Sequence, residues 1–245
     1  YTLSRLCMWD EIEKYSPYLN RIGIEGKAVS PLNLMYIEDN PLHHLKRAVK
    51  YAKEKKREEL PNIKHKKNNK IKIGYFSSDF RNHPVTHLLI RTLELHDQSK
   101  FKIYAYSLKK HKDDYTERIK NAVSCFREVS SMSDIQIVNI ARSDQLDIAI
   151  DLNGYTEFNR KSIFDYRVAP IQINYLGYPG TMGTESYDYI VADKVLIPEE
   201  NKKFYTEKVI YLPNSSIPYD DTKNIFKNRF NREKLGLPSD AFVFT

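Results

Sequence analysis

From Lys70 onwards the chain alternates short apolar runs, which are typical of strands, with longer segments whose apolar residues recur at helical spacing. The strand-like runs are 71–76, 101–106, 126–129, 146–152, 171–176, 189–191 and 209–212. The helical segments are 85–96, 113–123 and 135–142. Strands that alternate with helices form crossover units, so this pattern predicts an α/β fold with a parallel sheet covered on both faces.

The first 60 residues are predicted to be helical, with one buried face. The residues that recur there at helical spacing are Leu3, Leu6, Trp9, Ile12 and Tyr15 or Leu19. A further helix is predicted to begin at Asn40 and Pro41, because Pro suits the first helical position and Asn accepts a hydrogen bond from a free amide. The inner stripe of that helix is expected to be Leu42, Leu45, Val49 and Ala52.

Towards the end of the chain the pattern of apolar and polar residues changes. Residues 214–225 are polar and turn-rich, which is typical of a linker, and 231–238 indicate a short helix that Gly and Pro end. Residues 241–245 resemble the opening strand of another unit. We therefore expect a piece of a longer protein with three parts, namely a helical end and connector over 1–68, an α/β lobe over 69–225, and a linker with the start of a further lobe over 226–245.

The chain carries a net charge of +7, and its basic residues crowd between Lys46 and Lys72. That pattern favours a solvated helix face followed by a polar linker, and without a recognised nucleic-acid-binding module it disfavours nucleic acid as a partner. Cys7 and Cys125 lack the spacing of a disulfide framework or a zinc site, which fits a reducing compartment, and both are expected to be buried. No apolar run approaches the roughly 20 residues of a membrane span, and no signal peptide is visible, so we expect a cytoplasmic protein without a membrane partner.

Three unusual segments follow predicted strands, where ligands bind in open α/β sheets. In 77–87, His83 and His87 are four residues apart and could share one side of a helix that begins near Pro84. Asp79 lies within reach of the same turn, and a carboxylate beside an imidazole suits general acid–base chemistry. The alternative is that Asp79 or Asn82 caps the helix while the histidines make ordinary hydrogen bonds.

The other two segments are 151–156, with Arg160 just beyond it, and 175–183. Asn153 and Gly154 are a turn signal, but Gly154 also permits close backbone approach, and Asn153 and Thr156 offer hydrogen bonds. The glycines of 175–183 indicate either a loop shaped around a ligand or a tight strand exit. Neither a GxGxxG nor a GxxxxGK[ST] pattern occurs, which disfavours nicotinamide and Walker-type nucleotide binding, and no HExxH pattern indicates zinc.

Taken in order, these segments resemble a known family. IGYFSSDFRNHPVTH over 73–87, DLNGYT over 151–156 and APIQINYLGYPGTMG over 169–183 are similar to the N-lobe signatures of O-GlcNAc transferases. YDYI over 187–190 and EKVIYLP over 207–213 continue the resemblance across nearly the whole chain. Each motif alone is weak, whereas the ordered set is specific.

The resemblance implies a GT-B glycosyltransferase, in which two Rossmann-like lobes face each other behind tetratricopeptide-type helices. This chain would supply the N-lobe, and without its C-lobe it is expected to be inactive alone. The implied reaction transfers N-acetylglucosamine from UDP-GlcNAc to Ser or Thr hydroxyls of acceptor proteins or peptides, with inversion. It is expected to need no metal and no cofactor, and the chain contains no DxD motif of the kind that metal-dependent glycosyltransferases use. The alternatives are a SPINDLY-type protein O-fucosyltransferase and a non-catalytic acceptor-binding module.

The resemblance also implies roles for individual residues. Asp79 and His83 match the positions associated with the catalytic base or proton relay. The positions matched to substrate binding are His87, Asn153, Gly154, Thr156, Arg160, Leu176, Gly177 and Pro179. Val85 departs from the family where some members carry a hydroxyl residue, which leaves the acceptor identity open.

Overall fold

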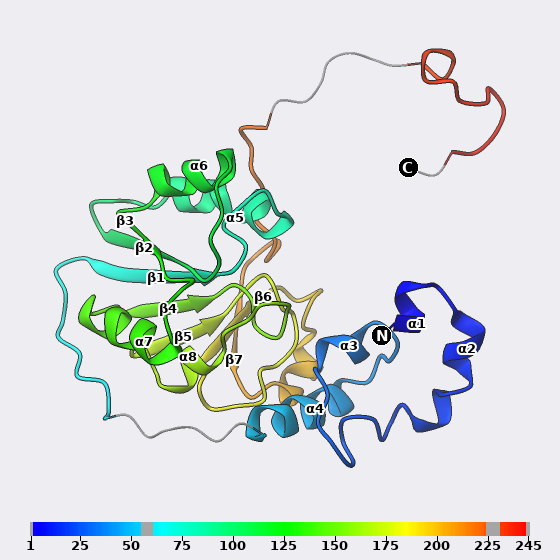
Figure 1. Ribbon diagram of the computed structural model, residues 1–245, viewed down its shortest axis with the longest axis horizontal. Helices are drawn as coiled ribbons and strands as arrows, with labels where there is room; N and C mark the ends of the chain where they lie inside the picture. Colours follow the sequence, from blue (N-terminus) through cyan, green and yellow to red (C-terminus); the bar gives the residue numbers. More distant parts are fainter. Residues whose placement is uncertain (1, 55–60, 224–230, 244–245) are drawn as a thin grey trace.

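A computed structural model describes residues 2–54, 61–223 and 231–243. Its centre is one sheet of seven strands, all parallel, in the order β3-β2-β1-β4-β5-β6-β7 (Figure 1). The strands are β1 (Ile71–Ser77), β2 (Phe101–Ser107), β3 (Cys125–Glu128), β4 (Ile148–Asp151), β5 (Ile171–Asn174), β6 (Tyr189–Ala192) and β7 (Lys208–Tyr211). Each lies within two residues of a predicted strand, so the predicted parallel α/β fold is confirmed.

Helices cover both faces of the sheet (Figure 1). On one side lie α5 (Pro84–Glu94) and α6 (Asp114–Ala122), and on the other lie α7 (Asp134–Ser143), α8 (Ser162–Asp165) and α4 (Pro41–Lys53). The caps are local: Asp113 accepts from the Thr116 amide at the start of α6, and Ser133 and Gln136 form a capping box on α7.

Each face has its own apolar core, because successive residues of a strand point to opposite sides. Tyr75 of β1 packs with Leu89 and Ile90 of α5, whereas Phe76 packs with Ile137 of α7 and Phe164 of α8. The residues of β1 alternate between the two cores, so this strand is buried on both faces.

The strand order reverses direction between β1 and β4. The chain builds outward from β1 to β3, and then returns to the other side of β1 to build β4 to β7. In open α/β sheets the crevice at such a switch point, outside the carboxyl ends of the strands, is where ligands bind. A binding site is therefore expected at the segments after β1 and β4.

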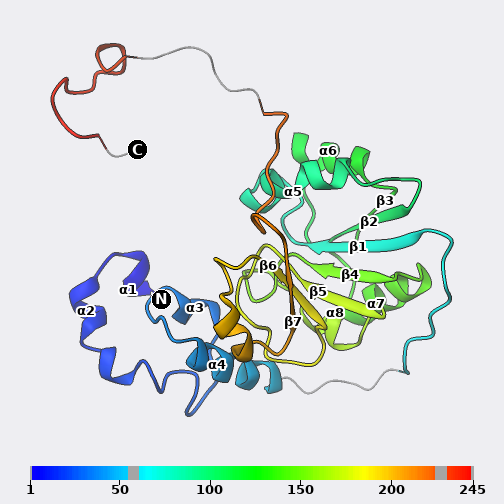
Figure 2. The same cartoon turned by 180° about the vertical axis from the view of Figure 1, so that it is seen from behind.

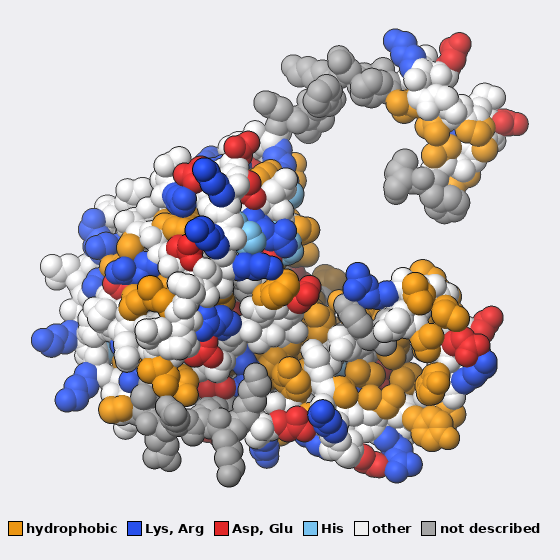
Figure 3. Space-filling view, in the orientation of Figure 1, with side chains coloured by type: hydrophobic (Ala, Val, Ile, Leu, Met, Phe, Trp, Pro, Cys, Tyr) orange, Lys and Arg blue, Asp and Glu red, His pale blue; other side chains and the backbone are white. Residues whose placement is uncertain are grey.

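The N-terminal segment differs from its prediction. It contains α1 (Thr2–Arg5), α2 (Trp9–Glu13), η1 (Ser16–Tyr18) and α3 (Leu32–Met35) before α4. Leu6, Trp9 and Tyr15 were expected in a buried face, but they are 64%, 57% and 53% exposed, and hydrophobic side chains are visible on the surface of this segment in Figure 3. The chain turns at Cys7, where φ is +53°, so no single helix carries the spacing across 3–15.

The inner face of α4 is also shifted from its prediction. Asn40 caps the helix as expected, with its side chain accepting from the His43 amide. Leu42 is 41% exposed, however, and the buried positions are Arg47, Ala48 and Ala52. The arginine is buried because it pairs with Glu38 and donates to carbonyls of the preceding segment.

Two further predictions need correction. Cys7 is exposed rather than buried, and Cys125 is only partly buried. Residues 241–243 form no strand, and 244–245 lie outside the described residues, as do 55–60 of the predicted helical region and 224–225 of the predicted linker. The short helix is present as η3 (Glu233–Leu235). No described helix is long and apolar enough to cross a membrane.

The rest of the predicted linker is tied down. Seen from behind, the segment that follows β7 runs across the sheet to α5 and α6 (Figure 2). Asp193 accepts from the Ser216 amide and hydroxyl at 2.7 Å each, and Arg118 of α6 donates to Asp220 at 2.7 Å. Residues 212–223, named here the strap, are therefore an ordered part of the lobe.

Candidate active site

The carboxyl ends of β1 and β4 carry a hydrogen-bonded cluster of polar side chains. Ser78 and Asp79 follow β1, and Asn153 follows β4; they are 0%, 9% and 1% exposed. Thr156, which is partly buried, completes the cluster. The sheet brings the two segments together because β1 and β4 are neighbours, paired at Phe76 and Asp151. We name these four residues the strand-end cluster.

Asn153 is the hub of the strand-end cluster. Its Oδ1 accepts from the Ser78 amide at 2.8 Å. Its Nδ2 donates to Ser78 Oγ at 2.8 Å, to Asp79 Oδ2 at 3.1 Å and to Thr156 Oγ1 at 3.1 Å. Both ends of the amide are therefore used, which fixes its orientation. The Asn–Gly turn predicted from the sequence is also a site-building element.

The turn that carries Asn153 is formed by Asp151 at the end of β4. Asp151 Oδ1 accepts from the amides of Asn153 at 2.9 Å and Gly154 at 3.1 Å, and its Oδ2 accepts from Tyr187 Oη at 2.6 Å. Complete burial raises the pKa of Asp151. Gly154 has φ of +56°, and an added Cβ would lie 2.5 Å from Tyr178 Cβ, so both conformation and packing require glycine here.

His83 faces the strand-end cluster from the start of α5. It is itself the N-cap, with Nδ1 accepting from the Val85 amide at 3.3 Å, so neither Asp79 nor Asn82 caps this helix. Its Nε2 lies 3.7 Å from Asp79 Oδ1. Burial lowers the pKa of His83 from its ordinary value, which favours the neutral imidazole. Because Nδ1 accepts a hydrogen bond, the neutral ring carries its proton on Nε2, towards Asp79.

His87 is engaged differently from His83. Its Nε2 bonds to Asn82 Oδ1 at 2.7 Å, and its ring centroid lies 4.6 Å from that of Tyr115. The two histidines predicted to share a side thus flank the same turn, but only His83 faces Asp79. A substrate-binding role of His87 stays a prediction.

The loop after β5 is closely packed on the end of β4. Gly177 N donates to Tyr175 O at 2.9 Å across Leu176, whose φ is +70°, which is the arrangement of a γ-turn. An added Cβ on Gly177 would lie 1.9 Å from Leu152 O, so only glycine fits. A strained φ at a non-glycine residue is typical of functional loops, and this one lies next to the turn of the strand-end cluster.

Two buried polar residues hold the rest of this loop. Asn174 Nδ2 donates to Tyr178 O at 3.1 Å and to Gly180 O at 3.2 Å. Glu207 accepts from Thr181 Oγ1 at 2.7 Å and from the Met182 amide at 2.6 Å. Burial raises the pKa of Glu207.

Pro179 and Arg160 lie apart from the strand-end cluster in their contacts. Pro179 lines a cavity of about 280 Å³ with the start of α4 and with η2 (Glu199–Phe204). Arg160 donates from Nε to Asp134 Oδ1 at 2.7 Å and from Nη2 to Met132 O at 2.7 Å, contacts that join it to α7. The substrate-binding roles given to Pro179 and Arg160 therefore stay predictions without geometric support.

The structure adds three residues that the sequence did not single out. Ser78 Oγ donates to Asp79 Oδ2 at 3.0 Å, Arg81 Nη2 lies 3.4 Å from Asp79 Oδ1, and His111 Nε2 bonds to Ser78 O at 2.8 Å. Ser78 and Arg81 belong to the segment already noted. His111 follows β2, and its place beyond a third neighbouring strand end was the signal that could have found it. In the described ranges no three His, Cys, Asp or Glu side chains gather in a way that could hold a metal ion.

The fold and the site define an α/β lobe with a polar cluster at the switch point of its sheet. The family model for glycosyltransferase family 41 matches residues 46–244. The chain belongs to this family.

Named relatives agree with the family assignment. The chain is 35% identical over 181 residues to a probable UDP-N-acetylglucosamine–peptide N-acetylglucosaminyltransferase, SEC, of Arabidopsis thaliana, covering 71% of this chain and 18% of that protein. It is 31% identical over 153 residues to the Arabidopsis thaliana protein SPINDLY, which bears the same enzyme name, covering 61% of this chain and 17% of that one.

A solved structure agrees as well. A mutant of the O-GlcNAc transferase of Thermobaculum terrenum matches with a TM-score of 0.71 and 26% identity, covering 82% of this chain and 42% of that one. The chain thus spans less than half of the solved relative and about a fifth or less of the two Arabidopsis relatives.

Proposed function

We propose that the chain is the acceptor-side lobe of an enzyme that transfers N-acetylglucosamine from UDP-GlcNAc to Ser or Thr hydroxyls of proteins. The observation that carries the proposal is the pair formed by Asp79 Oδ1 and His83 Nε2, 3.7 Å apart at the switch point of the sheet. The family assignment and the names of the relatives support the donor and the acceptor class.

The distance between Asp79 and His83 allows a hydroxyl group to bind between them. At 3.7 Å the two atoms are too far apart for a direct hydrogen bond, but one oxygen can lie within bonding distance of both. His83 Nε2–H would donate to the hydroxyl oxygen, and Asp79 Oδ1 would accept its proton as the bond to the sugar forms. The other carboxylate oxygen is held by Ser78 and Asn153, so Asp79 is presented in one orientation.

The proposal extends to stereochemistry and to the rest of the protein. Attack by the hydroxyl from the face opposite the leaving diphosphate gives inversion, and the groups of the strand-end cluster can assist it without a metal. We propose that a second lobe beyond residue 226 binds most of the donor, and that the helical segment 1–68 continues tetratricopeptide-type repeats.

The test is a transfer assay with the full-length protein, UDP-GlcNAc and a mixture of candidate acceptor proteins. The matched variant is Asp79→Asn, which keeps the shape and removes the charge; the control is Lys194→Ala, a change at an exposed position. We expect transfer by the wild type and the control, and a loss of at least about 100-fold in Asp79→Asn. Transfer only from GDP-fucose would refute the proposed donor, and full activity of Asp79→Asn would refute the proposed base.

A further inference from the structure

The loop after β2, residues 108–113, lies against the strand-end cluster. Leu108 N donates to Ser77 O at 2.8 Å, and His111 bonds to Ser78 O at 2.8 Å. On the far side of the loop, Asp113 Oδ2 accepts from the Asn82 amide at 2.8 Å. Whatever reaches Asp79 and His83 from this side therefore passes the side chains of this loop.

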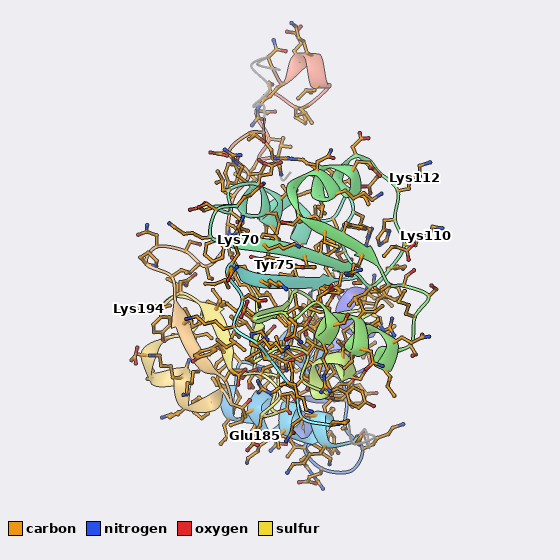
Figure 4. The ribbon with its side chains drawn as sticks, turned by 90° about the vertical axis from the view of Figure 1, so that its left-hand side faces the viewer. Lys70, Tyr75, Lys110, Lys112, Glu185 and Lys194 are labelled. Atoms are coloured by element: carbon orange, nitrogen blue, oxygen red, sulfur yellow. The ribbon has the colours of Figure 1, made fainter. Side chains whose placement is uncertain are left out.

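Those side chains are mostly lysines. Lys109, Lys110 and Lys112 are all exposed. In the part of the chain that the structure describes, Lys110 and Lys112 have no hydrogen bond or ion pair, and Figure 4 shows both projecting from one edge of the lobe. Two permanently charged groups without partners beside a candidate site favour an anionic ligand.

Lys109 is bound to an aromatic group of the opposite loop. Its Nζ lies 3.5 Å from the centroid of Phe158, which is 53% exposed and has φ of +57°. A phenylalanine with a positive φ and about half of its side chain exposed is uncommon, which indicates a contact surface. Lys109, Lys110, Lys112 and Phe158, named here the lysine rim, thus combine cations with an aromatic face.

The nearby carboxylates do not neutralise this rim. Asp113 is occupied as the N-cap of α6, and Asp79 is buried in the strand-end cluster. Asp114 lines a separate hollow with Arg118 on the side of α6. Glu157, next to Phe158, is an exposed carboxylate. One carboxylate does not offset the three lysines of the loop, so the rim keeps an excess of positive charge.

We infer that the enzyme prefers acceptor segments with acidic residues flanking the hydroxyl residue, and that Lys110 and Lys112 bind those carboxylates. This inference deepens the proposed function and rests on it for the acceptor. The ligand is an acidic polypeptide, because the site beside the rim receives a Ser or Thr side chain. The aromatic face of the rim can pack against a peptide while the lysines bind its carboxylates.

The first experiment measures transfer by the full-length protein to matched peptides that differ only in the flanks, with Glu, Gln or Lys around one Ser. We expect the Glu peptide to have a KM about three to ten times lower than the Gln peptide at low salt, a preference that shrinks with added NaCl. Equal KM values for the two peptides would overturn the inference while leaving the proposed function intact. Absence of transfer to every peptide would count against the proposed function instead.

The second experiment measures peptide binding without transfer, so that a failure of the inferred acceptor preference can be told apart from a failure of the proposed transferase function. Fluorescence polarisation of the labelled Glu peptide is compared for the full-length wild type, the double variant K110E/K112E, and the control Lys194→Glu, which lies at the opposite edge in Figure 4. We expect binding about tenfold weaker in the double variant and unchanged binding in the control. Loss of Glu and Gln peptide binding to the same extent, or tighter binding of single-stranded RNA than of the Glu peptide, would overturn the inference.

Discussion

Asn153→Asp is the change that tests the strand-end cluster most directly, because it replaces one NH₂ group by an oxygen of nearly the same size. The Oδ1 that accepts from the Ser78 amide is kept. The Nδ2 that donates to Asp79 Oδ2 at 3.1 Å becomes an acceptor, so two carboxylate oxygens then face each other inside the lobe.

The size of the effect follows from that distance. Two unit charges 3.1 Å apart repel by ~5 kcal/mol at an effective dielectric constant of about 20, which is a large part of the free energy of unfolding of a domain. The folded variant therefore holds one proton between the two carboxylates at a pH where the unfolded chain holds none. Because the folded state then binds more protons, its free energy of unfolding falls as pH rises, by up to about 1.4 kcal/mol per pH unit between pH 5 and 7.

The assay is urea unfolding of wild type, Asn153→Asp and the control Asn69→Asp at pH 5, 6, 7 and 8. Asn69 is exposed, and no described residue bonds to its side chain. We expect the free-energy difference between wild type and Asn153→Asp to grow from pH 5 to pH 7, while the control stays parallel to wild type. Parallel curves for Asn153→Asp would refute the 3.1 Å contact as the organising feature of the site.

Three other predictions concern single residues. In Gly177→Ala the new Cβ would start 1.9 Å from Leu152 O, and the loop must move by more than about 1 Å, which we expect to lower kcat/KM about 100-fold or more; wild-type kinetics would refute this. In His83→Ala, transfer should fall sharply while loss of the N-cap of α5 lowers the free energy of unfolding by only about 1 kcal/mol. The wild-type pH profile should decline only below the lowered pKa of His83; a flat profile through that range argues against the residue. Arg118→Ala leaves the buried Asp220 without its ion-pair partner, so limited proteolysis should cleave the strap faster, and an unchanged cleavage rate contradicts the tether.

The order of the elements could be predicted from the sequence because the five inner strands of the sheet, β2, β1, β4, β5 and β6, carry buried residues. Continuous or alternating apolar runs record that burial directly, as in β1 and β4. The same reasoning failed for the N-terminal segment, where the spacing of Leu6, Trp9 and Tyr15 crosses a turn at Cys7 that no apolar pattern records. Periodicity predicts a buried face only if one helix spans it.

The candidate site could be predicted in its parts but not in its connections. Strand ends and ordered motifs indicated Asp79 and His83 as a catalytic pair and Asn153 as a substrate-binding residue. Which atom of Asn153 bonds to which neighbour depends on the register of β1 against β4, a pairing of residues about 75 positions apart that composition does not encode. For the same reason the contacts of Arg160 with α7 could not be foreseen.

The positions of the site residues divide them into buried residues that hold the backbone of the site and exposed residues that are proposed to contact the substrate. Asp151, Asn153 and Glu207 are buried, and each bonds to backbone amides of the turns and loops it supports. His83 and the lysine rim are partly or fully exposed and make few bonds of their own. Substitutions of the buried group should therefore change stability and activity together, whereas substitutions of the exposed group should change activity or acceptor choice with little effect on folding.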